Sequence, residues 1–101
     1  MTNNTNQMMR VAETIRSQIH PHVLMCSASR NFGAFENEQG LYGIQFKISN
    51  ISKYKFATVR ITLNGADLYD IEIKNIRGRI VDSKTDIYCD QLSSILESMW
   101  E

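Results

Sequence analysis

The stretch from Thr58 to Ile76 constrains the fold of this chain more than any other part of the sequence. It reads TVRITLNGADLYDIEIKNI, and it contains two runs in which apolar and polar residues alternate with a period of two. This alternation is typical of β-strands that bury one face. Asn64-Gly65, a strong short-range signal of a β-hairpin, lies between the two runs. The sequence therefore predicts an antiparallel hairpin around which the rest of the domain is arranged.

The loop length of this hairpin follows from the direction of its side chains. A two-residue turn at Asn64-Gly65 would put the apolar residues of the two strands on opposite faces, because a one-residue slip reverses every side chain. An odd loop of three or five residues keeps one apolar face, with Ile61 opposite Tyr69 or Ile71 and the glycine at positive φ. Arg60 would then lie near the carboxylates of the second strand, as an exposed pair worth at most about 1 kcal/mol.

Two amphipathic helices are predicted near the ends of the chain. Residues 1–6 are polar and are expected to be disordered. Apolar residues at helical spacing predict a helix from Gln7 that Pro21 ends, because the residue before proline avoids the α conformation. A helix from about Asp86 to Trp100 follows a capping pattern that begins at Ser83. The remaining segments are strands at 23–28 and 41–48, a loop at 29–40, a connection at 50–55, a turn at 77–79 and a short edge piece at 80–81.

The predicted fold class is α+β, with the element order α-β-β-β-β-α. Short connections favour antiparallel neighbours, and a sheet with one apolar face needs one helical layer to cover it. We therefore expect a two-layer sandwich in which a four-stranded antiparallel sheet carries the N- and C-terminal helices on one face. With 101 residues the chain is expected to form a single domain, residues 1–101. The open sheet face is expected to be mixed in charge and therefore a poor interface.

Composition excludes several classes of function. Eleven basic residues balance eleven acidic ones, so no global field favours nucleic acid or an anionic membrane. No apolar run approaches the roughly 18 residues of a membrane span, and the first residues lack a signal-peptide layout. Cys26 and Cys89 lie in apolar patterns without Cys-x-x-Cys spacing. They are interpreted as reduced core residues of a cytoplasmic protein, with a disulfide between them as the alternative.

The sequence carries no recognisable catalytic constellation. His20 and His22 lack a third ligand at zinc spacing, so we interpret them as a helix-end cluster without a metal. Asp67, Asp70 and Glu72 are better explained by salt bridges and turn bonds than by acid–base chemistry. No serine lies in a nucleophile-elbow motif, and no glycine run suits a phosphate. We expect neither an enzyme nor a cofactor, a metal or a small-molecule substrate.

Two stretches are candidates for binding a macromolecule. The loop predicted at 29–40 is long for a compact domain, and it carries arginine and aromatic residues, which dominate interface energetics. We expect it to bind a protein partner through Arg30, Asn31, Phe32 and Phe35, unless one of the phenylalanines folds back under the loop. The second stretch alternates basic and aromatic residues, a pattern that suits single-stranded nucleic acid. The residues of this alternative site are Lys53, Tyr54, Lys55 and Arg60, and a solvated connection with an aromatic at the core edge is the plainer interpretation.

Several segments keep an order and spacing that resembles a family of small uncharacterised proteins encoded by bacteriophages and other mobile elements. They are LMCSASRNFGAF (24–35), GLYGIQFKI (40–48), VRITLN (59–64), DLYDIE (67–72), IRG (76–78) and IYCDQL (87–92). The resemblance covers residues 10–95 and implies a phage or mobile-element source, with action in the cytoplasm of a bacterial host. It implies no catalytic residues.

The expected function is therefore that of a non-enzymatic accessory protein that binds a host protein or a protein–nucleic-acid complex. An inhibitor of host defence, such as an anti-CRISPR protein, belongs to this class. The alternative is a small domain that binds single-stranded nucleic acid. No membrane partner is expected, and formation of a homodimer stays open.

Overall fold

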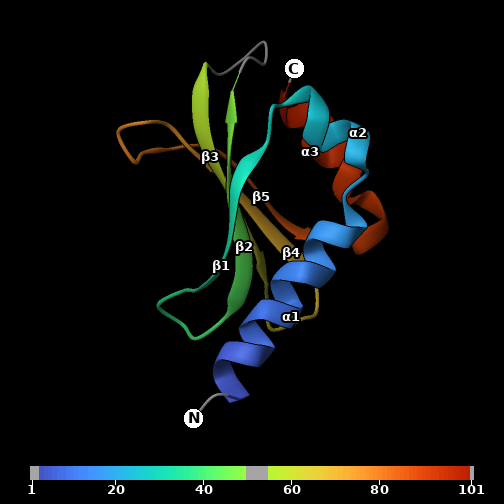
Figure 1. Cartoon of the computed structure of the whole chain (residues 1–101), viewed down its shortest axis with the longest axis vertical. Helices are drawn as coiled ribbons and strands as arrows, with labels where there is room; N and C mark the ends of the chain where they lie inside the picture. Colours follow the sequence, from blue (N-terminus) through green and yellow to red (C-terminus); the bar gives the residue numbers. More distant parts are fainter. Residues whose placement is uncertain (1–2, 50–54, 101) are drawn as a thin grey trace.

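The computed structural model describes residues 3–49 and 55–100, which form a two-layer α+β sandwich. Five antiparallel strands make one sheet in the order β1-β2-β3-β4-β5, and the helices lie together on one side of it (Figure 1). The elements are α1 (Asn3–Gln18), α2 (Pro21–Cys26), β1 (Arg30–Glu36), β2 (Tyr42–Ser49), β3 (Phe56–Leu63), β4 (Tyr69–Lys74), β5 (Ile80–Ile87), the 3-10 turn η1 (Cys89–Gln91) and α3 (Leu92–Trp100). The predicted layers and the helices on one face are confirmed, but the sheet has five strands and not four.

The β3–β4 hairpin has the odd loop that the alternation predicts. Ile61 pairs with Ile71 and Leu63 with Tyr69, which leaves five residues, 64–68, in the loop. The side-chain oxygen of Asn64 accepts hydrogen bonds from the backbone N–H groups of Ala66 and Leu68. The expectation that Gly65 takes a positive φ is wrong: within this loop Asp67 adopts it, at 61°. Aspartate tolerates this conformation because its short polar side chain can hydrogen-bond locally.

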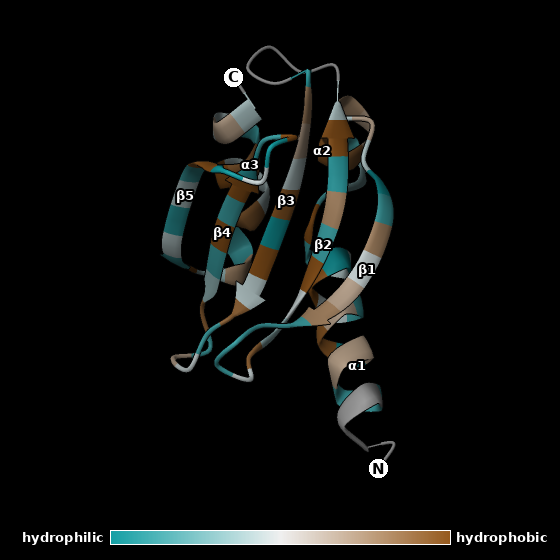
Figure 2. Ribbon diagram, turned by 90° about the vertical axis from the view of Figure 1, so that its left-hand side faces the viewer, coloured by the Kyte–Doolittle hydropathy of each residue, from teal (hydrophilic) through white to brown (hydrophobic). Residues whose placement is uncertain are grey.

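The core lies between the sheet and the helices, as the period-two pattern predicts. Alternating colours along the strands show the two faces in Figure 2. The core residues of the sheet face the helices and are Ile44, Phe46, Ile48, Ala57, Val59, Ile61, Tyr69, Ile71, Ile73 and Ile87. The helices cover them with Ala12, Ile15, Ile19, Val23, Leu92, Leu96, Met99 and Trp100.

The segment predicted as a first strand, 23–28, is instead the short helix α2. Pro21 is the first residue of this helix, where its fixed φ is favourable and its missing N–H costs nothing. The ring nitrogen Nδ1 of His20 caps the helix by accepting the N–H of His22. A short apolar run does not distinguish a strand from a helix by periodicity, which is why the prediction failed.

The segment predicted as a loop, 29–40, contains the edge strand β1. This strand pairs antiparallel with β2, but its register shifts between Arg30 and Gly33. Asn31 has a φ of 58° at this irregularity. Such a bulge breaks the alternation on which strand prediction depends. Only residues 37–41 connect β1 to β2.

The C-terminal region also differs from the prediction. Ile80–Ile87 forms a complete edge strand, so the supposed capping pattern at Ser83 lies within β5. Most of β5 is exposed on both faces, and it therefore lacks a clear alternation. The helix α3 begins only at Leu92, and it buries Leu92, Leu96 and Met99, whereas Tyr88 is exposed.

Two smaller expectations change as well. The helix α1 begins at Asn3, so residues 3–6, expected to be disordered, are helical. Cys26 and Cys89 are free thiols, but both are exposed and not part of the core. In the ranges that the structure describes, no helix is long and apolar enough to cross a bilayer.

Candidate functional site

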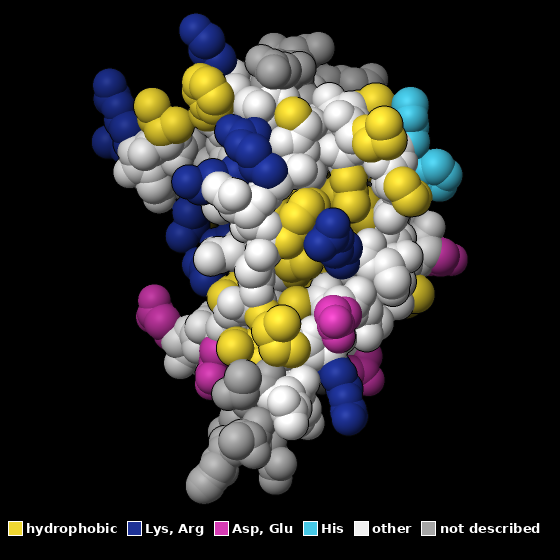
Figure 3. All heavy atoms as spheres, in the orientation of Figure 1, with side chains coloured by type: hydrophobic (Ala, Val, Ile, Leu, Met, Phe, Trp, Pro, Cys, Tyr) yellow, Lys and Arg dark blue, Asp and Glu magenta, His cyan; other side chains and the backbone are white. Residues whose placement is uncertain are grey.

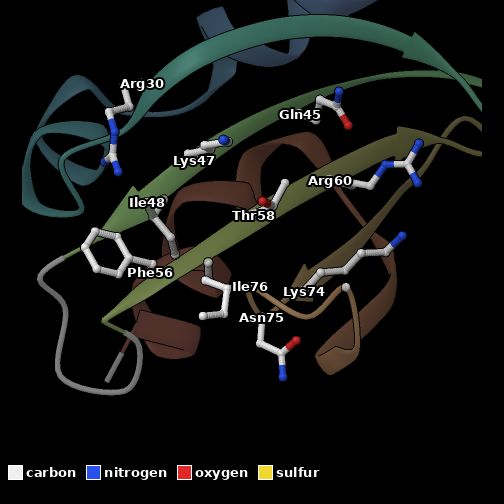
Figure 4. A pocket seen from close by; sticks show the side chains of 12 residues that line it. Arg30, Gln45, Lys47, Ile48, Phe56, Thr58, Arg60, Lys74, Asn75 and Ile76 are labelled. Carbon is white, nitrogen blue, oxygen red and sulfur yellow. The ribbon is translucent and has the colours of Figure 1, made fainter.

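A groove of about 490 Å³ lies on the sheet face that the helices leave open. It crosses β2, β3 and β4 and is bordered by the β4–β5 turn, as Figure 4 shows. Its lining residues are Arg30, Gln45, Lys47, Ile48, Phe56, Ala57, Thr58, Arg60, Lys74, Asn75, Ile76 and Gly78. Four of these residues are basic, and none carries a carboxylate.

The strand register brings these cations together. Arg30 of β1 pairs with Lys47 of β2, and Lys47 pairs with Thr58 of β3. Thr58 in turn pairs with Lys74 of β4, which completes one row across four strands. At about 4.8 Å per strand, the backbones of Lys47 and Lys74 lie about 10 Å apart. The row thus presents positive charges at intervals along a line, and not as one compact cluster.

Arg30 is anchored at one end of this row. Its Nη1 donates hydrogen bonds to the carbonyl oxygen of Ala28 at 3.1 Å and to the hydroxyl oxygen of Ser49 at 3.0 Å. Both bonds use the same guanidinium nitrogen, and an arginine has five N–H donors. The residue as a whole is exposed, so its charge is positioned yet accessible to solvent.

Arg60 is held by an aromatic ring and not by a carboxylate. It pairs with Glu72 across the β3–β4 ladder, as predicted. Its guanidinium carbon, however, lies 4.0 Å from the ring centroid of Phe35, a cation–π contact. Its buried Nε has no hydrogen-bond partner within the described part of the chain. The Phe35 ring fixes the position of this cation on the open face.

Exposed apolar side chains adjoin the cations. Phe56 is 51% exposed at the start of β3, and Ile76 is 80% exposed in the turn after β4. Both line the groove, and Phe56 lies with Arg30 near one end of it, whereas Arg60 and Lys74 lie at the other (Figure 4). The groove therefore offers positive charge and apolar contact side by side.

The charges of the protein are separated along the sheet. Lys55 precedes β3, and Arg77 and Arg79 lie in the β4–β5 turn, at the groove's end of the sheet. Glu36 and Asp67 lie at the opposite end, and Figure 3 shows basic and acidic groups at different heights along the sheet side of the molecule. The open face itself is mixed in charge, as predicted, because Glu72 of β4 lies on it beside Arg60 and Lys74, but basic residues gather towards the groove's end. The balanced total conceals this polarity.

The residues predicted to bind a protein do not form one surface. Arg30 and Asn31 are exposed. Phe32 is half-buried on the helix side, where its ring stacks on Phe46 at 5.0 Å between centroids. Phe35 is only 8% exposed and packs on the opposite face of the sheet. Of the four residues, Arg30 alone lines the groove.

The residues predicted for the nucleic-acid alternative are only partly described. Lys53 and Tyr54 lie outside the described residues. Lys55 is exposed next to β3, and Arg60 lines the groove. Arg30 and Arg60, which the sequence analysis assigned to two different sites, thus line the same groove.

The sequence reasoning missed three groove residues: Lys47, Lys74 and Ile76. Phe56 belongs to the stretch 53–56 that was considered for the nucleic-acid alternative. The alternation did place Lys47 and Lys74 on the outer face, which was the available signal. Their convergence depends on the pairing of β2, β3 and β4.

The histidines form a small cluster apart from the groove. Nε2 of His22 lies 3.4 Å from Sγ of Cys26, one turn along α2. Across residues 3–49 and 55–100, no group of three or more histidine, cysteine, aspartate or glutamate side chains is arranged to hold a metal.

No family model, curated protein or solved structure matches the chain.

Proposed function

We propose that this chain is a non-enzymatic binding protein and that its groove holds an anionic macromolecule. The observation that carries this proposal is the set of four cations, Arg30, Lys47, Arg60 and Lys74, converging from four strands on a surface without a lining carboxylate. On a protein of zero formal net charge, such a concentration needs a local partner of opposite sign.

The spacing of the cations favours an extended partner. A single exposed ion pair contributes at most about 1 kcal/mol, so useful affinity requires several pairs formed together. Lys47 and Lys74 are two strands apart in the row, so an extended partner can contact several of the cations at once. The exposed Phe56 and Ile76 also favour a partner that carries apolar surface beside its charges.

We place this binding in the accessory role that the sequence resemblance implies. The proposed setting is the cytoplasm of a bacterial host, with a host protein or a protein–nucleic-acid complex as the partner, and inhibition of host defence as the biological outcome. The resemblance to phage and mobile-element proteins supports this setting, and the groove supports the binding itself.

Chromatography on heparin, a polyanion, tests the use of the groove. Lys47→Glu combined with Lys74→Glu should elute at clearly lower salt than the wild-type protein. The matched control is Arg10→Glu combined with Lys84→Glu, which changes the net charge equally at exposed positions outside the groove. Equal elution of the two double variants would show that total charge, and not the groove, governs binding. Thermal melting of both variants should stay close to that of the wild type, because none of the four side chains is buried.

A further inference from the structure

We infer that the occupant of the groove is single-stranded nucleic acid, with phosphates along the cation row and a base stacked on Phe56. This inference rests on the proposed function and names the partner for the same site. It follows from how the basic and apolar side chains are arranged relative to each other.

The aromatic side chain stands directly beside the cation row. Phe56 and Thr58 are two residues apart on β3, so both point to the open face, about 7 Å apart along the strand. Thr58 lies in the row between Lys47 and Lys74. Each nucleotide carries a phosphate and a flat base, which are joined by one sugar. A strand that lays its phosphates on the row therefore brings a base within reach of the Phe56 ring.

The exposed apolar groups favour a single strand over a duplex. In a duplex the base faces are stacked inside, and the outer surface offers mainly phosphates and sugars. Phe56 and Ile76, which are 51% and 80% exposed, would then gain no apolar partner. In a single strand the base faces are free to stack on aromatic side chains, and this contact tolerates any sequence.

Uncharged polar groups in the groove fit the same partner. Gln45, Thr58 and Asn75 line it together with the cations. Hydroxyl and amide side chains commonly contact phosphates and sugars, and they position the strand without reading its sequence. An acidic protein would have to present carboxylates and an apolar side chain in matching positions, whereas nucleic acid repeats both features in every unit.

Fluorescence anisotropy tests the identity of the occupant. The probes are 5′-fluorescein-labelled 20-nucleotide strands of one mixed sequence, as DNA and as RNA, with the DNA duplex and labelled polyglutamate as comparisons. At least one single strand should bind more tightly than both comparisons. With four phosphate contacts, three at the cations of the row and one at Arg60, its affinity should fall about 50-fold between 50 and 200 mM salt, from the slope of about −0.7 per contact for single strands.

Two variants separate stacking from charge. Phe56→Ala should weaken binding of the single strand about fivefold or more and leave the salt slope unchanged. Lys74→Ala should reduce the salt slope by about 0.7. Tyr88→Ala is the matched control, because Tyr88 is an exposed aromatic residue that does not line the groove. This variant should bind the single strand as tightly as the wild type does.

Three results would overturn the inference. Equal affinity for single strand and duplex, with no effect of Phe56→Ala, would show that only phosphates are bound. Polyglutamate that binds as tightly as the single strands would indicate an acidic protein as the partner. A lack of binding to every probe would exclude nucleic acid. Each of these outcomes leaves the proposed function to be decided separately by the heparin comparison of the two double variants.

Discussion

Gly43 in β2 should be among the positions least tolerant of a side chain. It lies on the open face, opposite Thr62 of β3. A Cβ atom there would overlap the carbonyl oxygen of Ile61 and lie 2.9 Å from both the Cα of Thr62 and a ring carbon of Phe35. Two of these three atoms belong to the backbone of the neighbouring strand, so they cannot turn aside as a flexible side chain could. Gly43→Ala must therefore displace β3 or break its pairing with β2.

The expected cost follows from the atoms that would have to move. Overpacking a dense region typically costs about 1–3 kcal/mol. Because the overlap here is with the backbone of β3, the middle strand of the sheet, we expect the upper end, about 3 kcal/mol. For a domain of this size that corresponds to a decrease in melting temperature of about 12–24 °C.

Gly33→Ala provides a matched control for this experiment. Gly33 also lies in a strand, but a Cβ at this position meets nothing within 4 Å. The free energy of unfolding of the Gly33→Ala variant should therefore differ from that of the wild type by less than about 1 kcal/mol. A small gain in stability would reflect the lower entropy of the unfolded chain. Thermal unfolding followed by circular dichroism measures both variants. Equal melting temperatures would refute the close approach of β2, β3 and Phe35 at Gly43.

Two further predictions concern the core and the pH dependence of stability. Ile71→Ala should cost about 2–5 kcal/mol, because it empties a fully buried position opposite Ile61, whereas Lys47→Ala should change stability by less than about 0.5 kcal/mol. Equal denaturation midpoints would mean that the two faces of the sheet are reversed. Burial raises the pKa of Tyr69 above its ordinary value of 10.0, with a smaller contribution from Cys89 and an opposing one from its hydrogen bond to Gln18. The folded state thus holds this proton more tightly, so stability should be full below about pH 10 and fall as the pH rises towards the folded-state pKa. Tyr69→Phe should reduce this loss of stability at alkaline pH in denaturation curves. An unchanged pH dependence would contradict the assignment of the loss to Tyr69.

The central hairpin was predictable because two independent constraints agree on it. Val59 and Ile61 alternate with polar neighbours, and so do Ile71 and Ile73 on the next strand. Only an odd loop puts all of them on one face, and the observed pairing of Ile61 with Ile71 satisfies that requirement. Each strand would be ambiguous alone, but their common need for a single apolar face removes the ambiguity.

The segment from Pro21 to Glu36 was not predictable in the same way. The apolar run after Pro21 is too short for its period to separate a helix from a strand. The next strand is bulged at Asn31, so Phe32 and Phe35 lie on opposite sides of the sheet without a regular alternation between them. Both elements are stabilised by tertiary contacts. The helix α2 buries Val23, and β1 is held in the sheet by its pairing with β2.

The groove was hidden for a related reason. The relation of Lys74 to Thr58 follows from the hairpin alone, and it could have been derived from the sequence. The relation of Arg30 to Lys47 could not, since it requires that β1 be recognised as the neighbour of β2. A site built from one residue on each of several strands becomes visible only when the order of the strands is known.

The two ends of the open face differ in what covers them. Towards the acidic end, the Phe35 ring lies over Gly43 and supports Arg60, so the chain covers part of this face with its own side chains. Towards the basic end, Phe56 remains half-exposed beside the cation row. Because the helices complete the core on the other face, substitution of exposed groove side chains such as Lys47 and Phe56 should cost little stability, whereas substitution of Gly43 should cost much. The proposed binding groove and the tightly packed region at Gly43 thus lie towards different ends of one sheet face, and a partner in the groove would cover the part that the domain leaves open.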